Sequence, residues 1–187
     1  MKLKDVLIII AIYILLYLLG TALFVAFFST PLLQNIHVFF YRGISLIIVS
    51  GIIVGVVMLI LKMTMLKKLL VIRDILLMSC IFICVNMVLF THLPVTAERS
   101  VSVFILGYMS ENPDKSFTEQ DIQNELEHTY VREYQAVDKR MQEQIVTGTI
   151  ENNGTTYKIT KRGKEIIKLY NLVADWFKLN KQLIHPK

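Results

Sequence analysis

Basic side chains gather in the stretch YKITKRGKEIIK near the end of the chain, where Glu165 is the one acid among them. Ammonium and guanidinium groups at this density bind the phosphate oxygens of nucleic acids or lipid headgroups, or the carboxylates of an acidic protein. A solvated surface with ordinary Lys and Arg would give the same composition, so both interpretations stay open. The candidate phosphate- or partner-binding residues here are Lys158, Lys161, Arg162, Lys164 and Lys168.

A helix expected over residues 132–145 adds Lys139 and Arg140 to these candidates. In a DNA-binding domain this helix would enter the major groove. Its three cations are balanced by three acids, and the chain from residue 97 onward holds 13 cations and 13 acids. A neutral domain is a poor ligand for a phosphate backbone, which argues against nucleic acid as the partner.

The residue types that catalyse reactions or bind metals are scattered along the chain. The sequence contains no GxSxG, HExxH or CxxC motif and no glycine-rich phosphate loop. Cys80 and Cys84 lie in an apolar run without a His or carboxylate beside them, and His92 has no carboxylate within one helical turn. We therefore expect no catalytic residue, no metal site and no cofactor, although the chain could complete the active site of a partner enzyme.

The elements that carry these side chains divide by composition. The chain has 187 residues, of which 54% are hydrophobic and 19% charged, and most of the apolar residues precede Pro94. A bilayer is crossed by about 20 apolar residues. Three runs qualify, at about 6–28, 43–61 and 72–91, which predicts an all-α membrane domain with three transmembrane helices over residues 1–93. A juncture (94–99) and a polar domain (100–187) follow.

Three residues within these spans are candidates for helix packing. Gly51 and Gly55 form a GxxxG pair, which lets a second helix from this chain or another approach closely. Small residues are also common in membrane helices that have no such role. Asn86 is the one strongly polar side chain well inside the third span, and we expect it to hydrogen-bond a neighbouring helix.

Cations near the ends of the spans predict the orientation, because loops rich in Lys and Arg remain in the cytoplasm. The net charge of +5 lies within residues 1–96, which hold seven cations and two acids. The loop between the first two spans offers only Arg42. The bias predicts a cytoplasmic N-terminus and a C-terminal domain in the periplasm of a bacterial inner membrane. The cytoplasmic cations would be Lys2, Lys4, Lys62, Lys67, Lys68 and Arg73.

The polar half alternates between helical and β-prone patterns. Apolar residues at steps of three and four predict helices over about 101–109, 116–130 and 132–145, and a fourth from Glu165 onward. Before the fourth, IVTGTIE and TTYKIT flank Asn153-Gly154, which suits a two-residue type I′ hairpin turn. The third helix carries an amphipathic stripe of Tyr134, Val137, Met141 and Ile145. On the fourth, the side chains expected to face inward are Ile166, Tyr170, Val173 and Phe177.

This order of three helices, a hairpin and a fourth helix resembles the winged helix-turn-helix superfold, and the passage YKITKRGKEI carries the resemblance. It covers about half of the chain. The resemblance implies a small α+β winged-helix-like domain behind the membrane domain. It does not select a function, because this superfold serves both DNA binding and protein–protein interaction.

The juncture HLPVTAERSVSVFIL is similar to a stretch that follows the last span in small bacterial inner-membrane proteins of surface-polysaccharide gene neighbourhoods. This resemblance implies a setting and not an activity. Pro94 can end the span, and Thr96 or Ser100 can cap the next helix. Arg99 would then lie at headgroup level, where it could bind a lipid phosphate or anchor the interface.

The C-terminal stretch NLVADWFKLNKQLIHPK mixes aromatic with basic side chains. We expect Trp176 and Phe177 to pack on the domain at the end of the fourth helix. The alternative is that these rings, together with Lys178 and Lys181, rest on a bilayer surface.

Together the patterns predict a non-catalytic membrane-anchored accessory or scaffold protein of envelope assembly, in particular of surface polysaccharide. Its partners would be the lipid bilayer and other membrane or envelope proteins, with an anionic lipid or lipid-linked phosphate as a further ligand. The alternative is a membrane-tethered winged-helix DNA-binding transcription regulator with a cytoplasmic polar domain. A third hypothesis, a subunit of an enzyme for lipid-linked sugars, would require Asp74, Glu98 or Arg99.

Overall fold

The computed structural model describes residues 3–67 and 69–186. Within them the chain is mostly helical and carries one two-stranded sheet. It divides into two compact units, a membrane unit (Met1–Val103) and a polar unit (Phe104–Lys187). Lys2 and Lys68, on which part of the predicted orientation rests, lie outside the described residues.

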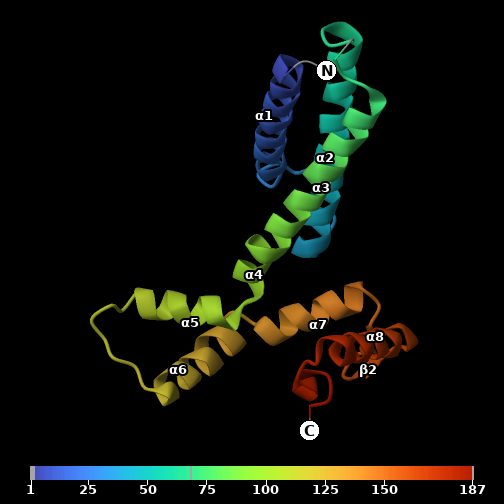
Figure 1. The fold of residues 1–187 in the computed structure, drawn as a ribbon. Coiled ribbons are helices and arrows are strands. Elements are labelled where there is room, and N and C mark those ends of the chain that lie inside the picture. The colour runs from blue at the N-terminus through green and yellow to red at the C-terminus, as the bar shows by residue number, and fades with distance from the viewer. Residues whose placement is uncertain (1–2, 68, 187) are drawn as a thin grey trace. The chain divides into compact units, whose positions relative to one another are not determined.

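Three helices of the membrane unit are long and apolar enough to cross a bilayer, which confirms the predicted number of spans. They are α1 (Leu3–Phe27), α2 (Phe39–Thr64) and α3 (Ile72–His92), and the third candidate span continues through α4 (Pro94–Arg99). At about 1.5 Å per residue, α1 measures roughly 37 Å, which exceeds the hydrocarbon thickness of about 30 Å. The three helices lie alongside one another (Figure 1).

Pro94 interrupts the third span without ending it. Proline has no amide hydrogen, so one helical hydrogen bond is missing at this position. The flanking bonds persist, because the Leu93 amide donates to the Leu89 carbonyl at 2.9 Å and the Ala97 amide donates to the Leu93 carbonyl at 2.8 Å. The predicted juncture 94–99 is therefore the short helix α4.

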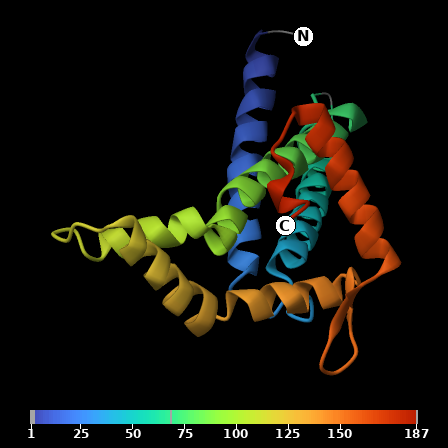
Figure 2. The same ribbon diagram turned by 90° about the horizontal axis from the view of Figure 1, so that it is seen from below.

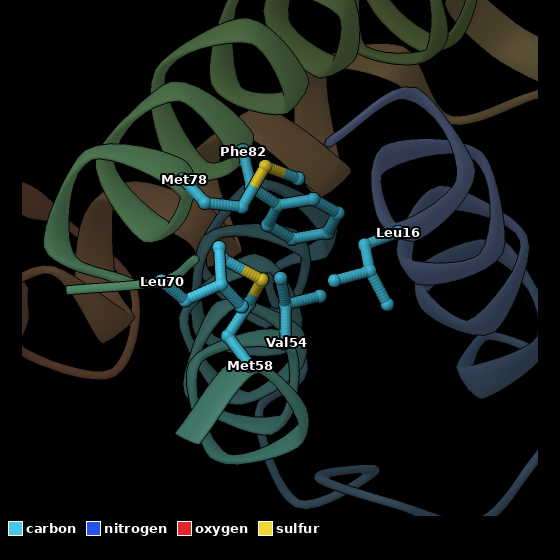
Figure 3. Packing of buried hydrophobic residues seen from close by; sticks show 6 residues of the cluster. All are labelled: Leu16, Val54, Met58, Leu70, Met78 and Phe82. Atoms are coloured by element: carbon cyan, nitrogen blue, oxygen red, sulfur yellow. The ribbon is translucent and has the colours of Figure 1, made fainter. Parts of the chain in front are cut away.

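Side chains from all three spans meet in one apolar cluster (Figure 3). Helix α1 contributes one residue, α2 and α3 contribute two each, and the loop before α3 contributes one. Met58 and Phe82 are fully buried there. The members are Leu16, Val54, Met58, Leu70, Met78 and Phe82.

A second, aromatic cluster lies where α1 ends and α2 begins. Phe90 of α3 stands at its centre, with ring centroids 6.0 Å from Phe24, 6.0 Å from Phe28 and 5.4 Å from Phe39. Arg42 lies 5.5 Å from the Phe28 ring and donates hydrogen bonds to carbonyl groups of the loop between α1 and α2. The single cation that the sequence assigns to this loop thus lies in the first turn of α2 and is held against the protein.

The outward faces of the spans are apolar and exposed. On α1, for example, Leu7, Ile14 and Leu18 each leave more than half of their surface uncovered. Acyl chains would solvate such faces in a bilayer, where the helical backbone satisfies its own hydrogen bonds.

In the polar unit, helices and a hairpin follow one another in the predicted order. The π-helix η1 continues α6 directly. The hairpin projects as a narrow orange loop in Figure 2. The elements are α5 (Val101–Ser110), α6 (Glu119–Glu125), η1 (Leu126–Glu133), α7 (Ala136–Val146), β1 (Ile150–Asn152), β2 (Tyr157–Ile159), α8 (Lys161–Phe177) and the 3-10 turn η2 (Lys181–Leu183).

The predicted start of the third helix at Arg132 is wrong. Gln135 adopts a left-handed conformation with φ of 50°, which separates η1 from α7 into two helices. Arg132 therefore belongs to η1, and α7 begins at Ala136.

The fourth helix starts earlier than the predicted position, Glu165. Thr160 is its N-cap, because the Thr160 Oγ1 accepts a hydrogen bond from the Gly163 amide at 3.1 Å. Helix α8 consequently begins at Lys161, and its first turn contains Lys161, Arg162 and Lys164, which therefore do not lie on the hairpin, the wing of a winged-helix domain.

The hairpin turn lies one residue later than predicted. The Asn153 amide donates to the Thr156 carbonyl at 2.9 Å, so Gly154 and Thr155 occupy the turn. Gly154 has a φ of 94°, but Asn153 lacks the positive φ that a type I′ turn requires at both central positions. The Asn152 side chain accounts for the shift, because its Oδ1 accepts from the Gly154 amide at 2.8 Å.

The polar unit has little interior of its own. Among its described residues, only Thr149, Gly163 and Ala174 are buried. A ring contact joins α5 to η1, with the Phe104 centroid 5.4 Å from that of Tyr130.

The inward orientation predicted for two aromatic residues of α8 is wrong. Tyr170 is 56% exposed and Phe177 is 71% exposed. Trp176 is 68% exposed, so the expected packing of the C-terminal rings on the domain is also wrong. Ile166 and Val173 are half-buried, which leaves the apolar side of α8 only partly covered.

Candidate functional site

Gly51 and Gly55 lie where α2 meets α3 of the same chain. A Cβ atom on Gly51 would stand 2.7 Å from Ile83 Cγ1, and one on Gly55 would stand 2.9 Å from Ser79 Oγ. The two glycines therefore let α3 approach α2 closely. This GxxxG pair serves packing within the chain.

Asn86 of α3 is 1% exposed and connects two spans. Its Oδ1 accepts a hydrogen bond from Thr21 Oγ1 of α1 at 3.2 Å, and its Nδ2 donates to the Phe82 carbonyl at 3.0 Å. Both ends of the amide are thus satisfied without water, which a side chain within a bilayer requires.

Asn86→Leu is expected to weaken the attachment of α1 by about 0.6–1.7 kcal/mol, because hydrogen bonds between membrane helices contribute that much. Thr21→Val removes the same bond from the other side while it keeps the side-chain shape. Unfolding of the full chain in mixed micelles with SDS measures each loss. The double variant should lose less than the sum of the two single losses, and strict additivity would show that no bond joins the two side chains. Thr64→Val is the control, because the Thr64 hydroxyl donates to Ile60 of its own helix.

The eight candidate binding cations lie on four different elements. Arg99 lies on α4, whereas Lys139 and Arg140 lie on α7. Lys158 lies on β2, opposite Glu151 of β1. The remaining four lie on α8 and not on the wing: Lys161, Arg162, Lys164 and Lys168.

Three of these cations are neutralised by acids on their own helices. The shortest distance, 2.7 Å, joins Arg140 to Glu143. Each pair lowers the local charge available to a ligand, and the exposed pair of Lys168 with Glu165 adds little stability. The other two nitrogen–oxygen pairs are Lys168 to Glu165 at 2.9 Å and Arg99 to Glu98 at 3.2 Å.

Lys161, Arg162 and Lys164 are exposed in the first turn of α8. At about 100° per residue, Lys161 and Lys164 point to similar sides of the helix, and Arg162 points about 100° away from Lys161 and about 160° away from Lys164. Cations at the start of a helix are opposed by the helix dipole. Helix stability therefore does not explain this cluster, whereas attraction to an anionic surface would.

Charge is segregated along the polar half. Residues 100–160 hold five cations and ten acids, whereas residues 161–187 hold seven cations and two acids. The total of zero from residue 97 onward conceals these two opposite segments. A running sum of charge along the sequence is the signal that reveals them.

The acidic segment also exposes apolar side chains. On α7, Val137 is 56% exposed and Val146 is exposed as well, and Tyr134 is exposed just before the helix. Met141 and Ile145 are half-buried. The predicted α7 stripe is thus partly uncovered, next to acidic groups.

Within the described parts of the chain, His, Cys, Asp and Glu side chains form no group of three that could hold a metal ion. Comparison of the chain with protein-family models, with curated proteins and with solved structures finds no match.

Proposed function

We propose that the chain is a non-catalytic accessory or scaffold protein of a bacterial inner membrane, which binds envelope proteins through a periplasmic winged-helix-like domain. The three apolar helices support membrane anchorage. The order of helices and hairpin in the polar unit supports a winged-helix-like fold. Surface-polysaccharide assembly is the proposed setting, on the resemblance of the juncture around Pro94 and Arg99.

The observation that carries this proposal is the uncovered apolar surface of the polar unit. A domain of this size that folds alone removes most of its large apolar side chains from water. Here Ala174 is the only apolar side chain buried among the unit's described residues. A partner protein would cover exposed apolar residues of the acidic segment, among them Leu106, Met109, Val131, Tyr134, Val137 and Val146.

A second candidate is a membrane-tethered DNA-binding regulator, and one observation favours it. Lys158 lies on the hairpin, and Lys161, Arg162 and Lys164 follow closely in the first turn of α8, so cations on and beside the wing could contact phosphates. The acidic charge of residues 100–160 opposes it, because that segment contains α7, the helix that would enter the groove.

The side of the membrane on which the chain ends separates the two candidates. Alkaline phosphatase fused after Lys187 is expected to be active, because this enzyme folds only in the periplasm. Green fluorescent protein fused at the same point is expected to be dark, because its fluorophore does not form in the periplasm after export in the unfolded state. Fusions after Met65, between α2 and α3, serve as the control and should show the opposite pair of results. A fluorescent, phosphatase-negative C-terminus would overturn the periplasmic scaffold and favour the regulator.

A further inference from the structure

Helix α8 has a broad apolar side. At about 100° per residue, its apolar side chains other than Leu172 fall within an arc of roughly 180°. Most of its charged residues fall on the opposite side. The arc contains Ile166, Ile167, Leu169, Tyr170, Val173, Ala174, Trp176 and Phe177.

The start of α8 is fixed on the hairpin, whereas much of the apolar arc is exposed. The Thr160 amide donates to the Thr149 carbonyl at 3.1 Å, and the Thr160 hydroxyl donates to the Gly148 carbonyl at 2.8 Å. Gly163 packs directly on Thr149. Farther along, Ala174 is buried but the aromatic residues Tyr170, Trp176 and Phe177 are more than half exposed.

The segment that carries this apolar surface is rich in cations. Residues 161–187 hold seven cations and two acids, and Lys178 and Lys181 directly follow the exposed rings. Lys181 bonds to Asp175 at 2.7 Å, which leaves the excess of positive charge in place. An amphipathic helix with aromatic residues on one face and Lys or Arg on the other is the type that lies at the surface of an anionic bilayer.

We propose that α8 and the turn after it lie in the headgroup layer of the anionic membrane that the three spans cross. The rings of Trp176 and Phe177 would enter the boundary between headgroups and acyl chains, and the lysines would contact lipid phosphates. Because the chain is tethered to this membrane by its spans, the second contact is intramolecular and needs little affinity of its own.

A second copy of the chain fits this surface less well. A two-fold symmetric contact would place one α8 against the other. Both would carry the same excess of positive charge, so their approach would be opposed. The acidic segment before α8 is repelled by an anionic bilayer, which leaves α7 available to the protein partner proposed above.

Trp176 makes this proposal directly measurable, because it is the only tryptophan of the chain. The full chain would be placed in lipid nanodiscs, one copy per disc, with phosphatidylcholine alone or mixed with phosphatidylglycerol. If the ring lies about 5–10 Å into the headgroup–acyl boundary, brominated acyl chains should quench its fluorescence about twofold. The quenching should grow with the phosphatidylglycerol fraction and fall with added salt.

Two charge variants test the electrostatic part. Arg162→Glu with Lys164→Glu should reduce the quenching in anionic discs. Because acids in the first turn stabilise a helix, unfolding of α8 would not explain this reduction. Lys115→Glu with Arg132→Glu changes the total charge equally outside α8 and should leave the quenching unchanged.

Two outcomes would overturn the proposal. Trp176 emission that stays water-like and unquenched in every disc would remove α8 from the membrane. Emission that shifts to shorter wavelength only with two copies per disc, without quenching by lipid, would assign the surface to a second copy. Helix α8 would meet anionic lipid in either leaflet, so the quenching result does not depend on the side of the membrane that the C-terminal fusions report.

Discussion

Gly43→Leu is expected to disrupt the packing of the membrane unit. A Cβ atom at this position would stand 1.9 Å from the Phe90 Cζ atom and 2.4 Å from its Cε1 atom. Phe90 is 1% exposed and is surrounded by the rings of Phe24, Phe28 and Phe39, so it has no space into which it can move. Overpacking of this kind costs about 1–3 kcal/mol and sometimes more, and a clash below 2 Å belongs at the upper end.

The measurement is thermal unfolding of the full chain in detergent, followed by circular dichroism of the helices. Gly43→Leu should lower the midpoint clearly, whereas Gly107→Leu should not, because no atom lies within 4 Å of a Cβ atom at Gly107. Gly43→Leu combined with Phe90→Ala should recover part of the loss, since the added volume replaces the removed ring. Equal midpoints for Gly43→Leu and Gly107→Leu would show that α2 and α3 do not approach as described.

The three spans are predictable because hydropathy is summed over about 20 residues, and such a sum tolerates local irregularities such as Pro94. The neighbours of the glycines are not predictable in the same way. The spacing of Gly51 and Gly55 shows that some helix can approach α2. Only the fold identifies it as α3 of the same chain, with Ile83 and Ser79 at the contact.

An apolar stripe indicates which side of a helix avoids water, but not what covers it. The pattern of Tyr170 and Phe177 correctly places both on the apolar side of α8. The domain interior does not cover this side, because both rings are more than half exposed.

Local side-chain hydrogen bonds explain the shifted element boundaries. Asn153-Gly154 has the composition of a type I′ turn, yet the neighbouring Asn152 binds the Gly154 amide and moves the turn by one residue. Thr160 likewise caps α8 ahead of Glu165. Several side chains compete for the same backbone amides, and the sequence does not show which of them is close enough to bond.

Gly163→Ala is expected to loosen the hairpin from α8. A Cβ atom at Gly163 would stand 2.2 Å from the Thr149 carbonyl oxygen, which belongs to the backbone and cannot rotate away. The same oxygen accepts the hydrogen bonds of the Thr160 amide and hydroxyl, at 3.1 Å each. Relief of the clash therefore breaks the contacts that fix the direction of α8, at an overpacking cost of about 1–3 kcal/mol.

Hydrogen exchange of the full chain in nanodiscs measures this loosening. The amides of Thr160 and Gly163 should exchange about 10- to 100-fold faster in Gly163→Ala, in proportion to the cost of the clash. Gly107→Ala is the matched control, because the same change in the open middle of α5 should stabilise that helix by about 1 kcal/mol. Unchanged exchange at Thr160 in Gly163→Ala would mean that the hairpin does not hold α8. In that case the hydrogen bonds of Thr160 would not fix the direction of α8, and they would not explain the exposure of Trp176.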